Sequence, residues 1–257
     1  MNRVLITRPR TQADSFAGAL IQAGFEPIFF PVIEIRPIEE TAELDLALQQ
    51  LGNFDWVIFT SVNGVKVFWA RLNALGIATL PNAVQVAAIG PKTALALQQH
   101  GIEPDFVPAE YVAEAILPGL GDLVGKRVLL PRAEIARKAL PEAITQAGGV
   151  VHEIATYQTL SSQPDPEGLA AFHSGVDAIT FTSPSTVRSF INIVKEAGFD
   201  PLNLPNRPLI VCIGPITAAA ARQEGLQVGL IAAEYTTEGL VNTLNKHFAR
   251  EIKRDPK

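Results

Sequence analysis

The second half of this sequence repeats the first half, and no other feature constrains the fold as strongly. The matching blocks are Arg3-Val4-Leu5 with Arg127-Val128-Leu129, Phe59-Thr60-Ser61 with Phe181-Thr182-Ser183, and Ile89-Gly90-Pro91 with Ile213-Gly214-Pro215. The first and third pairs lie 124 positions apart, and the second pair lies 122 apart. Solenoid repeats have periods of about 20 to 50 residues, so a period this long indicates one domain-sized unit present twice. The sequence therefore predicts two similar lobes.

Each repeat alternates apolar runs of strand length with stretches of helical periodicity. In the first repeat the expected strands are residues 4–7, 26–30, 56–59, 84–88 and 104–107, and the expected helices are 12–23, 62–72, 91–99 and 112–117. Such alternation is typical of parallel sheets with helices on both faces. We therefore predict an α/β fold of two similar lobes, each a flavodoxin-like parallel sheet flanked by helices. Segments 31–37 and 155–163 show no helical pattern and are predicted to be extended crossings between the lobes.

Composition excludes several classes of protein. The 257 residues carry a formal net charge of -5, whereas a general nucleic-acid binder needs clustered Lys and Arg to neutralise phosphates. No apolar run approaches the ~18 to 20 residues of a membrane span, and the single cysteine, Cys212, cannot form an intramolecular disulfide. The first residues contain no apolar leader segment, so we expect a cytoplasmic protein without nucleic-acid or membrane partners.

Hydroxyl groups follow four of the expected strands in matched pairs. The turns are Thr60-Ser61-Val62-Asn63 with Thr182-Ser183-Pro184-Ser185, and Gly90-Pro91-Lys92-Thr93 with Gly214-Pro215-Ile216-Thr217. In open α/β sheets, ligands bind beyond the carboxyl ends of the strands, where helix N-termini present free N–H groups. These turns can therefore bind carboxylates or phosphates without a large positive charge. The alternative is that the same residues only cap their helices, since Ser and Thr are favoured N-caps in any protein.

Two arginines and one tyrosine are further candidates for ligand binding. Arg8 and Arg132 follow the first strand of each repeat at matching positions. An arginine there can bind a carboxylate through two parallel hydrogen bonds, and the alternative is a solvated surface charge. The tyrosine breaks the symmetry of the repeat, because Tyr157 aligns with Ile33 at the offset of 124. Tyr157 can donate a proton, or its ring can simply pack between elements while the hydroxyl meets water.

Metal and nucleophile chemistry have little support in the sequence. The four histidines show no metal-binding spacing, and the sequence contains no nucleophile elbow, P-loop or dinucleotide fingerprint. Cys212 lies within an apolar run, where an inert core thiol is expected. We therefore predict no metal site and no nucleotide cofactor.

The order and spacing of several short motifs resemble those of the uroporphyrinogen-III synthase family. The motifs are Leu5-Ile6-Thr7-Arg8-Pro9, Phe59-Thr60-Ser61, Ile89-Gly90, Ala155-Thr156-Tyr157-Gln158-Thr159, Phe181-Thr182-Ser183-Pro184-Ser185 and Ile213-Gly214-Pro215-Ile216-Thr217-Ala218. The resemblance covers essentially the whole chain. It implies discontinuous lobes, with residues 1–34 and 161–257 in one, 38–156 in the other, and crossings near 35–37 and 157–160. The repeat by itself suggests two contiguous halves.

The resemblance also implies a reaction. Members of the family convert linear hydroxymethylbilane, which carries eight carboxylates, to the macrocycle uroporphyrinogen III, a precursor of haem and sirohaem. The conversion involves loss of water and inversion of ring D, and it needs no cofactor. The family is also taken to imply a monomer that meets hydroxymethylbilane synthase transiently.

Site residues are carried over from the family position by position. The family's substrate-binding turns match Thr60, Ser61, Thr93, Ser183 and Thr217. Its best catalytic candidate matches Tyr157, whose favoured role is to help the ring A hydroxyl leave as water. Together with the residues chosen above, the predicted substrate-binding set also includes Arg8, Gly90, Arg132 and Gly214.

Two other functions stay open from the residues alone. One is a bilobed protein that binds or senses a small anion without catalysis, and the other is a transferase acting on a phosphorylated metabolite. Incubation with hydroxymethylbilane and separation of uroporphyrinogen isomers I and III discriminates among all three functions.

Overall fold

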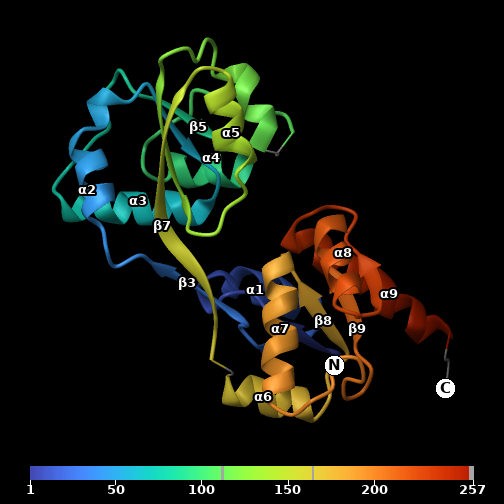
Figure 1. Cartoon of the computed structure of the whole chain (residues 1–257). Helices are drawn as coiled ribbons and strands as arrows, with labels where there is room; N and C mark the ends of the chain where they lie inside the picture. The colour runs from blue at the N-terminus through green and yellow to red at the C-terminus, as the bar shows by residue number, and fades with distance from the viewer. Residues whose placement is uncertain (111–112, 164, 255–257) are drawn as a thin grey trace. The chain divides into compact units, whose positions relative to one another are not determined.

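The computed structural model describes residues 1–110, 113–163 and 165–254, and it divides the chain into two compact units. Unit 1 consists of Met1–Glu34 and Leu160–Lys257, and unit 2 consists of Ile35–Thr159. Each unit is built around a five-stranded sheet with helices on both faces (Figure 1). The predicted fold class, an α/β structure with two mostly parallel sheets flanked by helices, is confirmed.

The sheet of unit 1 has the strand order β10-β9-β8-β1-β2, and every neighbouring pair is parallel. Its elements are β1 (Arg3–Ile6), η1 (Arg10–Gln12), α1 (Asp14–Gln22), β2 (Glu26–Phe29), α6 (Pro166–His173), β8 (Ala178–Phe181), α7 (Pro184–Glu196), β9 (Leu209–Cys212), α8 (Pro215–Gln223), β10 (Val228–Ile231) and α9 (Thr237–Arg254). Successive side chains of a strand face opposite sides of the sheet. Leu5 therefore packs in the layer of α6, α7 and α8, whereas Val4 and Ile6 pack in the layer of α1 and α9.

The sheet of unit 2 has the strand order β3-β7-β6-β4-β5. Its elements are β3 (Ile33–Pro37), α2 (Ala42–Gln49), η2 (Leu51–Asn53), β4 (Trp56–Phe59), α3 (Val62–Ala74), β5 (Gln85–Ala88), α4 (Pro91–Gln98), η3 (Ala113–Gly119), β6 (Arg127–Ala133), α5 (Ala139–Gln146) and β7 (Val150–Ser161). The core again has two layers. Val57 and Phe59 pack with α2, α3 and α4, and Ile58 packs on the other face with η3 and α5.

Four corresponding strands have the same order in both sheets, and the fifth strand lies on opposite edges, β10 beside β9 in unit 1 and β3 beside β7 in unit 2. Each unit combines strands from both repeats. By the offsets of 122 and 124, β6 corresponds to β1, β7 to β2, β4 to β8 and β5 to β9. In unit 1, β1 and β2 from the first repeat join β8, β9 and β10 from the second. In unit 2, β6 and β7 from the second repeat join β4 and β5 from the first. Each compact unit therefore takes the beginning of one repeat and the remainder of the other.

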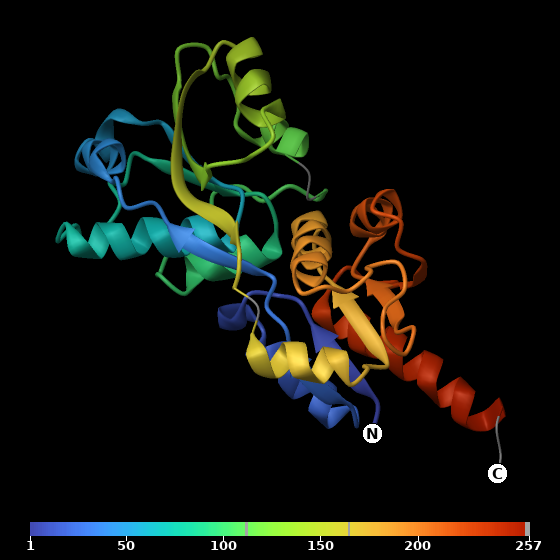
Figure 2. The same cartoon turned by 60° about the horizontal axis from the view of Figure 1, so that its bottom comes forward.

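The segments expected to be extended crossings are strands. Segment 31–37 contains β3 and segment 155–163 contains the end of β7, and each strand runs across a boundary between the units. They are neighbours in the sheet, and the Ile38 N–H donates to the Thr156 carbonyl at 3.0 Å. Both views show the two strands side by side (Figures 1 and 2).

Two predicted elements are wrong in type. Residues 104–107 form only an isolated bridge between Ala87 and Phe106, because Pro104 and Pro108 on either side lack the N–H groups that a ladder needs. The helix predicted over 112–117 is the 3-10 helix η3, and Pro118 inside it removes a further helical donor. Val112, the first residue of that predicted helix, lies outside the described residues.

The longest described helix, α9, is amphipathic. Leu240 and Leu244 are fully buried, while Asn242, Lys246 and Arg250 belong to the same 18-residue helix. Across the described residues, no helix reaches the combination of length and apolarity that a membrane span requires.

In each sheet the strand order reverses at one place, between β1 and β8 in unit 1 and between β6 and β4 in unit 2. At such a switch point the connections leave the sheet in opposite directions, so the carboxyl ends of the two strands border an open crevice. The turns after β8 and β4 begin with Thr182-Ser183 and Thr60-Ser61. Two of the four predicted hydroxyl turns therefore lie at the places where ligands bind in this class of fold, and the two Gly-Pro turns follow the next strands, β5 and β9.

Candidate active site

Tyr157 and Ser61 meet at the switch point of unit 2. Ser61 follows β4 and is the N-cap of α3, and its Oγ accepts a hydrogen bond from the Gly64 N–H at 3.0 Å. Tyr157 lies on β7, paired with Ala133 at the end of β6, and only 7% of its surface is exposed. The Tyr157 hydroxyl lies 2.9 Å from Ser61 Oγ. The structure thus brings two of the predicted site residues into direct contact.

Gly64 lets the first turn of α3 approach β6 closely. A Cβ atom at this position would lie 2.9 Å from the Pro131 carbonyl oxygen and 3.3 Å from Ser61 Oγ. The carbonyl belongs to the backbone of β6, which is paired with β7 at this position and so has little freedom to turn away. The missing side chain at position 64 therefore helps to hold Ser61 near β7.

We expect Gly64→Ala to lower the free energy of unfolding by about 2 kcal/mol, the usual cost of overpacking a tight contact. It should also lower activity, since α3 must move away from β6 and take Ser61 with it. The matched control is Gly18→Ala in α1, where an added Cβ meets nothing within 4 Å. That change should stabilise by about 0.5 to 1 kcal/mol, because alanine favours a helix more than glycine does. Denaturant titration of both variants checks the contrast, and equal stabilities would contradict it.

The two Gly-Pro turns have the same geometry in both units. Gly90 and Gly214 are extended N-caps of α4 and α8, and a proline follows each at the first helical position. Thr93 and Thr217 are each 4% exposed, and within the described part of the chain neither hydroxyl forms a hydrogen bond. The first turns of these helices carry the positive end of the dipole. Pro91 and Pro215 have no N–H, and the Thr93 N–H already donates to the Gly90 carbonyl at 3.1 Å. Each turn can thus offer one hydroxyl and its remaining backbone donors to an anion.

At the switch point of unit 1 the hydroxyl groups cluster among themselves. Ser183 caps α7 and forms a capping box with Thr186. Ser183 Oγ also lies 2.9 Å from Ser185 Oγ. Ser185 belongs to the matched turn Thr182-Ser183-Pro184-Ser185 but not to the predicted site, and its correspondence with the polar Asn63 is the sequence signal for it. Thr60 is half-buried at the corresponding turn of unit 2.

Arg8 is half-buried after β1 in unit 1. Its Nη2 donates to Gln12 Oε1 at 3.3 Å. Burial lowers the pKa of Arg8 from its ordinary value, and the nearby Glu238 carboxylate acts in the opposite direction. A guanidinium stays protonated through such shifts. Arg8 is therefore a cation at the carboxyl edge of the unit 1 sheet, with a carboxylate already close to it.

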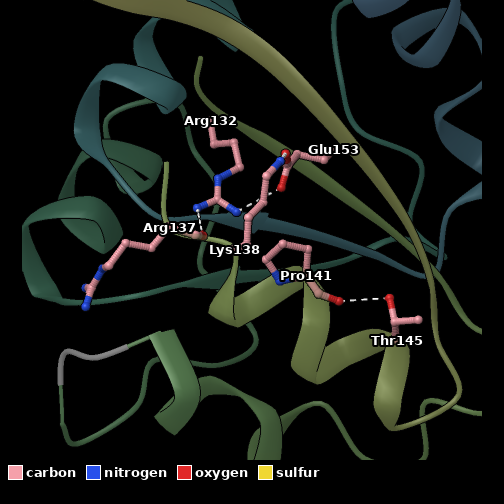
Figure 3. A network of polar contacts seen from close by, with 6 residues as sticks. All are labelled: Arg132, Arg137, Lys138, Pro141, Thr145 and Glu153. Atoms are coloured by element: carbon pink, nitrogen blue, oxygen red, sulfur yellow. Dashed lines mark hydrogen bonds and ion pairs between the residues drawn. The ribbon is translucent and has the colours of Figure 1, made fainter. Parts of the chain in front are cut away.

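Arg132 is engaged within unit 2. Its Nη1 donates to Glu153 Oε2 at 3.1 Å and its Nη2 to the Arg137 carbonyl at 2.7 Å, while Lys138 pairs with the other oxygen of Glu153 (Figure 3). The Arg132 side chain is 7% exposed, and its buried Nε has no hydrogen-bond partner within the described residues. This guanidinium holds the segment between β6 and α5, and its place in substrate binding stays a prediction.

The predicted residues fall into two groups by unit. Unit 1 contains Arg8, Ser183, Gly214 and Thr217, and unit 2 contains Thr60, Ser61, Gly90, Thr93, Arg132 and Tyr157. Within these groups the Ser61–Tyr157 contact is a direct side-chain hydrogen bond.

Burial raises the pKa of the Cys212 thiol to about 12, which agrees with the inert core thiol expected from sequence. Across the described residues, no three His, Cys, Asp or Glu side chains gather as metal ligands would.

Comparison with known proteins identifies the family. The family model described as uroporphyrinogen-III synthase HemD matches residues 14–242. The chain belongs to the uroporphyrinogen-III synthase family. It is 32% identical over 253 residues to the uroporphyrinogen-III synthase of Synechococcus elongatus, with 96% of each chain covered. It is 30% identical over 240 residues to that of Chlorobaculum parvum, with 90% of this chain and 93% of the relative covered.

Solved structures of the family share the fold. A mutant uroporphyrinogen III synthase of the extreme thermophile Thermus thermophilus superposes with a TM-score of 0.65 at 23% identity, covering 99% of this chain and all of that one. The synthase of Helicobacter pylori gives a TM-score of 0.62 at 18% identity, covering 98% of this chain and all of that one. These structures support the fold. The family model and the relatives confirm the resemblance found in the sequence motifs, and with it the expectation of an enzyme of the uroporphyrinogen-III synthase family.

Proposed function

We propose that this protein converts hydroxymethylbilane to uroporphyrinogen III, with loss of water and inversion of ring D. Family membership supports the reaction, and the hydrogen-bonded pair of Ser61 and Tyr157 is the observation that supports a proton donor within it. Most of the catalysis is positioning, since the substituted carbon of ring D must attack before the unsubstituted one. Rigid turns at the ends of buried strands suit that task.

The first chemical step is departure of the ring A hydroxyl. Tyr157 gives its phenolic proton to that hydroxyl, the carbon–oxygen bond breaks, and water leaves. Electrons from the pyrrole of ring A form the azafulvene that ring D then attacks. The phenolate recovers its proton from the pyrrole carbon that closes the macrocycle, which must lose a proton for that pyrrole to become aromatic again. Tyr157 is well placed for this because its hydroxyl lies at the switch point of unit 2, beside a helix N-terminus.

Within each unit, the hydroxyl turns are the proposed binders of substrate carboxylates. Thr60 and Thr93 serve in unit 2, and Ser183 and Thr217 serve in unit 1. The helix N-termini behind these turns attract anions by about 0.3 to 1 kcal/mol each. Arg8 adds a cation in unit 1. The departure from symmetry, Lys92 in one Gly-Pro turn and Ile216 in the other, gives the two turns different affinities for a carboxylate.

We expect carboxylate binding to be distributed, so that no single threonine is essential. Thr60→Ala and Thr217→Ala should each weaken substrate binding by about 0.5 to 1.5 kcal/mol, the net value of one neutral hydrogen bond. Steady-state kinetics should show a raised KM with a nearly unchanged kcat. Complete loss of activity in a folded Thr60→Ala protein would refute distributed binding.

The test of the proposed function is a product assay. Freshly made hydroxymethylbilane is incubated with the protein and the uroporphyrinogen isomers are separated. An excess of isomer III over the isomer I that forms spontaneously is expected. Isomer I alone, at the rate of the protein-free control, would sink the proposal and favour a binding or sensor protein.

Several further features belong to the same proposal. The two units act as the lobes of the enzyme, and the strands β3 and β7 act as the crossings between them. The enzyme works in the cytoplasm, as a monomer, and meets hydroxymethylbilane synthase transiently. Its product enters haem and sirohaem biosynthesis. Size-exclusion chromatography with light scattering tests the monomer, and cell fractionation tests the location.

A further inference from the structure

The contact between Ser61 and Tyr157 has two possible hydrogen-bond directions, and they differ in chemistry. Either hydroxyl can be the donor across the 2.9 Å that separates the two oxygens. When Tyr157 donates to Ser61, its proton is committed within the protein. When Ser61 donates to Tyr157, the phenolic proton is free to point at a ligand. Only the second direction leaves Tyr157 ready to protonate a leaving group.

The surroundings of Ser61 favour the second direction. Ser61 Oγ already accepts the Gly64 N–H at 3.0 Å, so one of its lone pairs is used and its own proton is more readily donated. Both oxygens lie at the N-terminus of the 13-residue helix α3, where the dipole stabilises negative charge. A phenol that gives up its proton becomes such a charge. Since only 7% of Tyr157 is exposed, few water molecules can replace Ser61 as the donor that stabilises it.

The other unit shows that this arrangement is not simply a consequence of the repeat. Ser183 corresponds to Ser61 and caps α7 in the same way, but its Oγ pairs with Ser185 at 2.9 Å. The residue that corresponds to Tyr157 is Ile33, which has no hydroxyl. The two N-cap serines share a backbone role, and only Ser61 has a phenol as its partner.

We propose that Ser61 is a positioning residue that donates its hydrogen bond to Tyr157 and so keeps the phenolic proton directed outward for catalysis. The proposal rests on the proposed function, because it assumes that Tyr157 protonates the leaving hydroxyl. It also changes the role of Ser61 in the predicted site. A serine whose proton is given to Tyr157 has no proton left for a substrate carboxylate.

Kinetics of Ser61 variants test the coupling. Ser61→Ala should lower the rate of uroporphyrinogen III formation roughly ten- to a hundredfold, the value of a hydrogen bond to a group that becomes charged. In a Tyr157→Phe background the same change should cost no further rate. Ser61→Thr keeps a hydroxyl and an N-cap and should restore most of the rate. Equal losses from Ser61→Ala in both backgrounds would overturn the proposal, because the loss would then not pass through Tyr157.

Tyrosine Raman spectroscopy tests the direction itself without any substrate. The chain has three tyrosines, so Tyr111→Phe with Tyr235→Phe leaves Tyr157 as the single phenol. The intensity ratio of the tyrosine Fermi doublet distinguishes a phenol that accepts a hydrogen bond from one that donates. We expect an acceptor signal, its loss in Ser61→Ala, and no change in Ser183→Ala, the matched N-cap variant of unit 1. A donor signal in the protein that retains Ser61 would overturn the proposal.

The two measurements separate this inference from the proposed function. If the protein with Tyr157 as its single tyrosine forms isomer III but gives a donor signal, the role of Ser61 is wrong and the reaction stands. If it forms only isomer I, as does the unaltered protein, the proposed function fails, and the inference fails with it.

Discussion

Replacing Tyr157 by Phe is expected to slow formation of uroporphyrinogen III by about 10²- to 10⁴-fold, the contribution of a positioned general acid. The ring is kept, so packing in the β7 region stays intact and the free energy of unfolding should fall only by the hydrogen bond to Ser61, about 0.5 to 1.5 kcal/mol. As the enzyme slows, spontaneous closure competes, and the fraction of isomer I should rise. Single-turnover kinetics with isomer separation measures both quantities.

The fall should be large but incomplete, because the leaving hydroxyl can also depart with help from water or a substrate carboxylate. Ile33→Val, at the position of unit 1 that corresponds to Tyr157, is a suitable control. It trims a residue that is 7% exposed and should cost about 0.5 to 1.5 kcal/mol of stability without changing the isomer ratio. If Tyr157→Phe leaves both the rate and the isomer ratio unchanged, Tyr157 has no part in the chemistry and positioning alone must account for it.

The parts of the site whose conformation is set by neighbouring residues in the chain could be predicted from the sequence. Ser61 and Ser183 can be predicted because serine before a helix is a favoured N-cap, and the Gly-Pro turns can be predicted because proline suits the first helical position. The strands around them follow from apolar runs of strand length. The apolar pattern of residues 104–107 predicts a strand, but the missing N–H groups of Pro104 and Pro108 limit this segment to an isolated bridge.

The contacts between distant segments could not be predicted in this way. The repeat makes β1 and β6 similar in sequence, so β1 can in principle complete either a sheet with β4 or one with β8, and both choices give the same strand order. Periodicity therefore cannot tell contiguous lobes from exchanged ones. The Ser61–Tyr157 contact depends on the register of β7 along β6, which shifts near Arg132 and Ala133, and no local pattern reveals that shift.

The contacts of Arg132 are a second case in which distant segments meet. By net charge alone, removing an acidic side chain from a chain of net charge -5 should raise the free energy of unfolding, but these contacts predict that it falls. We expect Glu153→Gln to lower the free energy of unfolding by about 3 kcal/mol, because it leaves a guanidinium with 7% exposure without its counter-ion. The value lies at the low end for buried pairs, since Glu153 itself is 28% exposed. Urea denaturation measures the change.

Arg132→Met should cost less than Glu153→Gln, because it removes the buried charge and its unpartnered Nε together and fills the same space with an apolar chain. Lys138 still pairs with Glu153 in that variant, so the carboxylate keeps a partner. The double variant should be close to Arg132→Met alone. The same proteins decide between the two roles of Arg132. If Arg132 binds a substrate carboxylate, KM should rise in a stable Arg132→Met protein and not in Glu153→Gln, where the cation is still present. If Arg132 only holds the segment before α5, KM should rise equally in both variants.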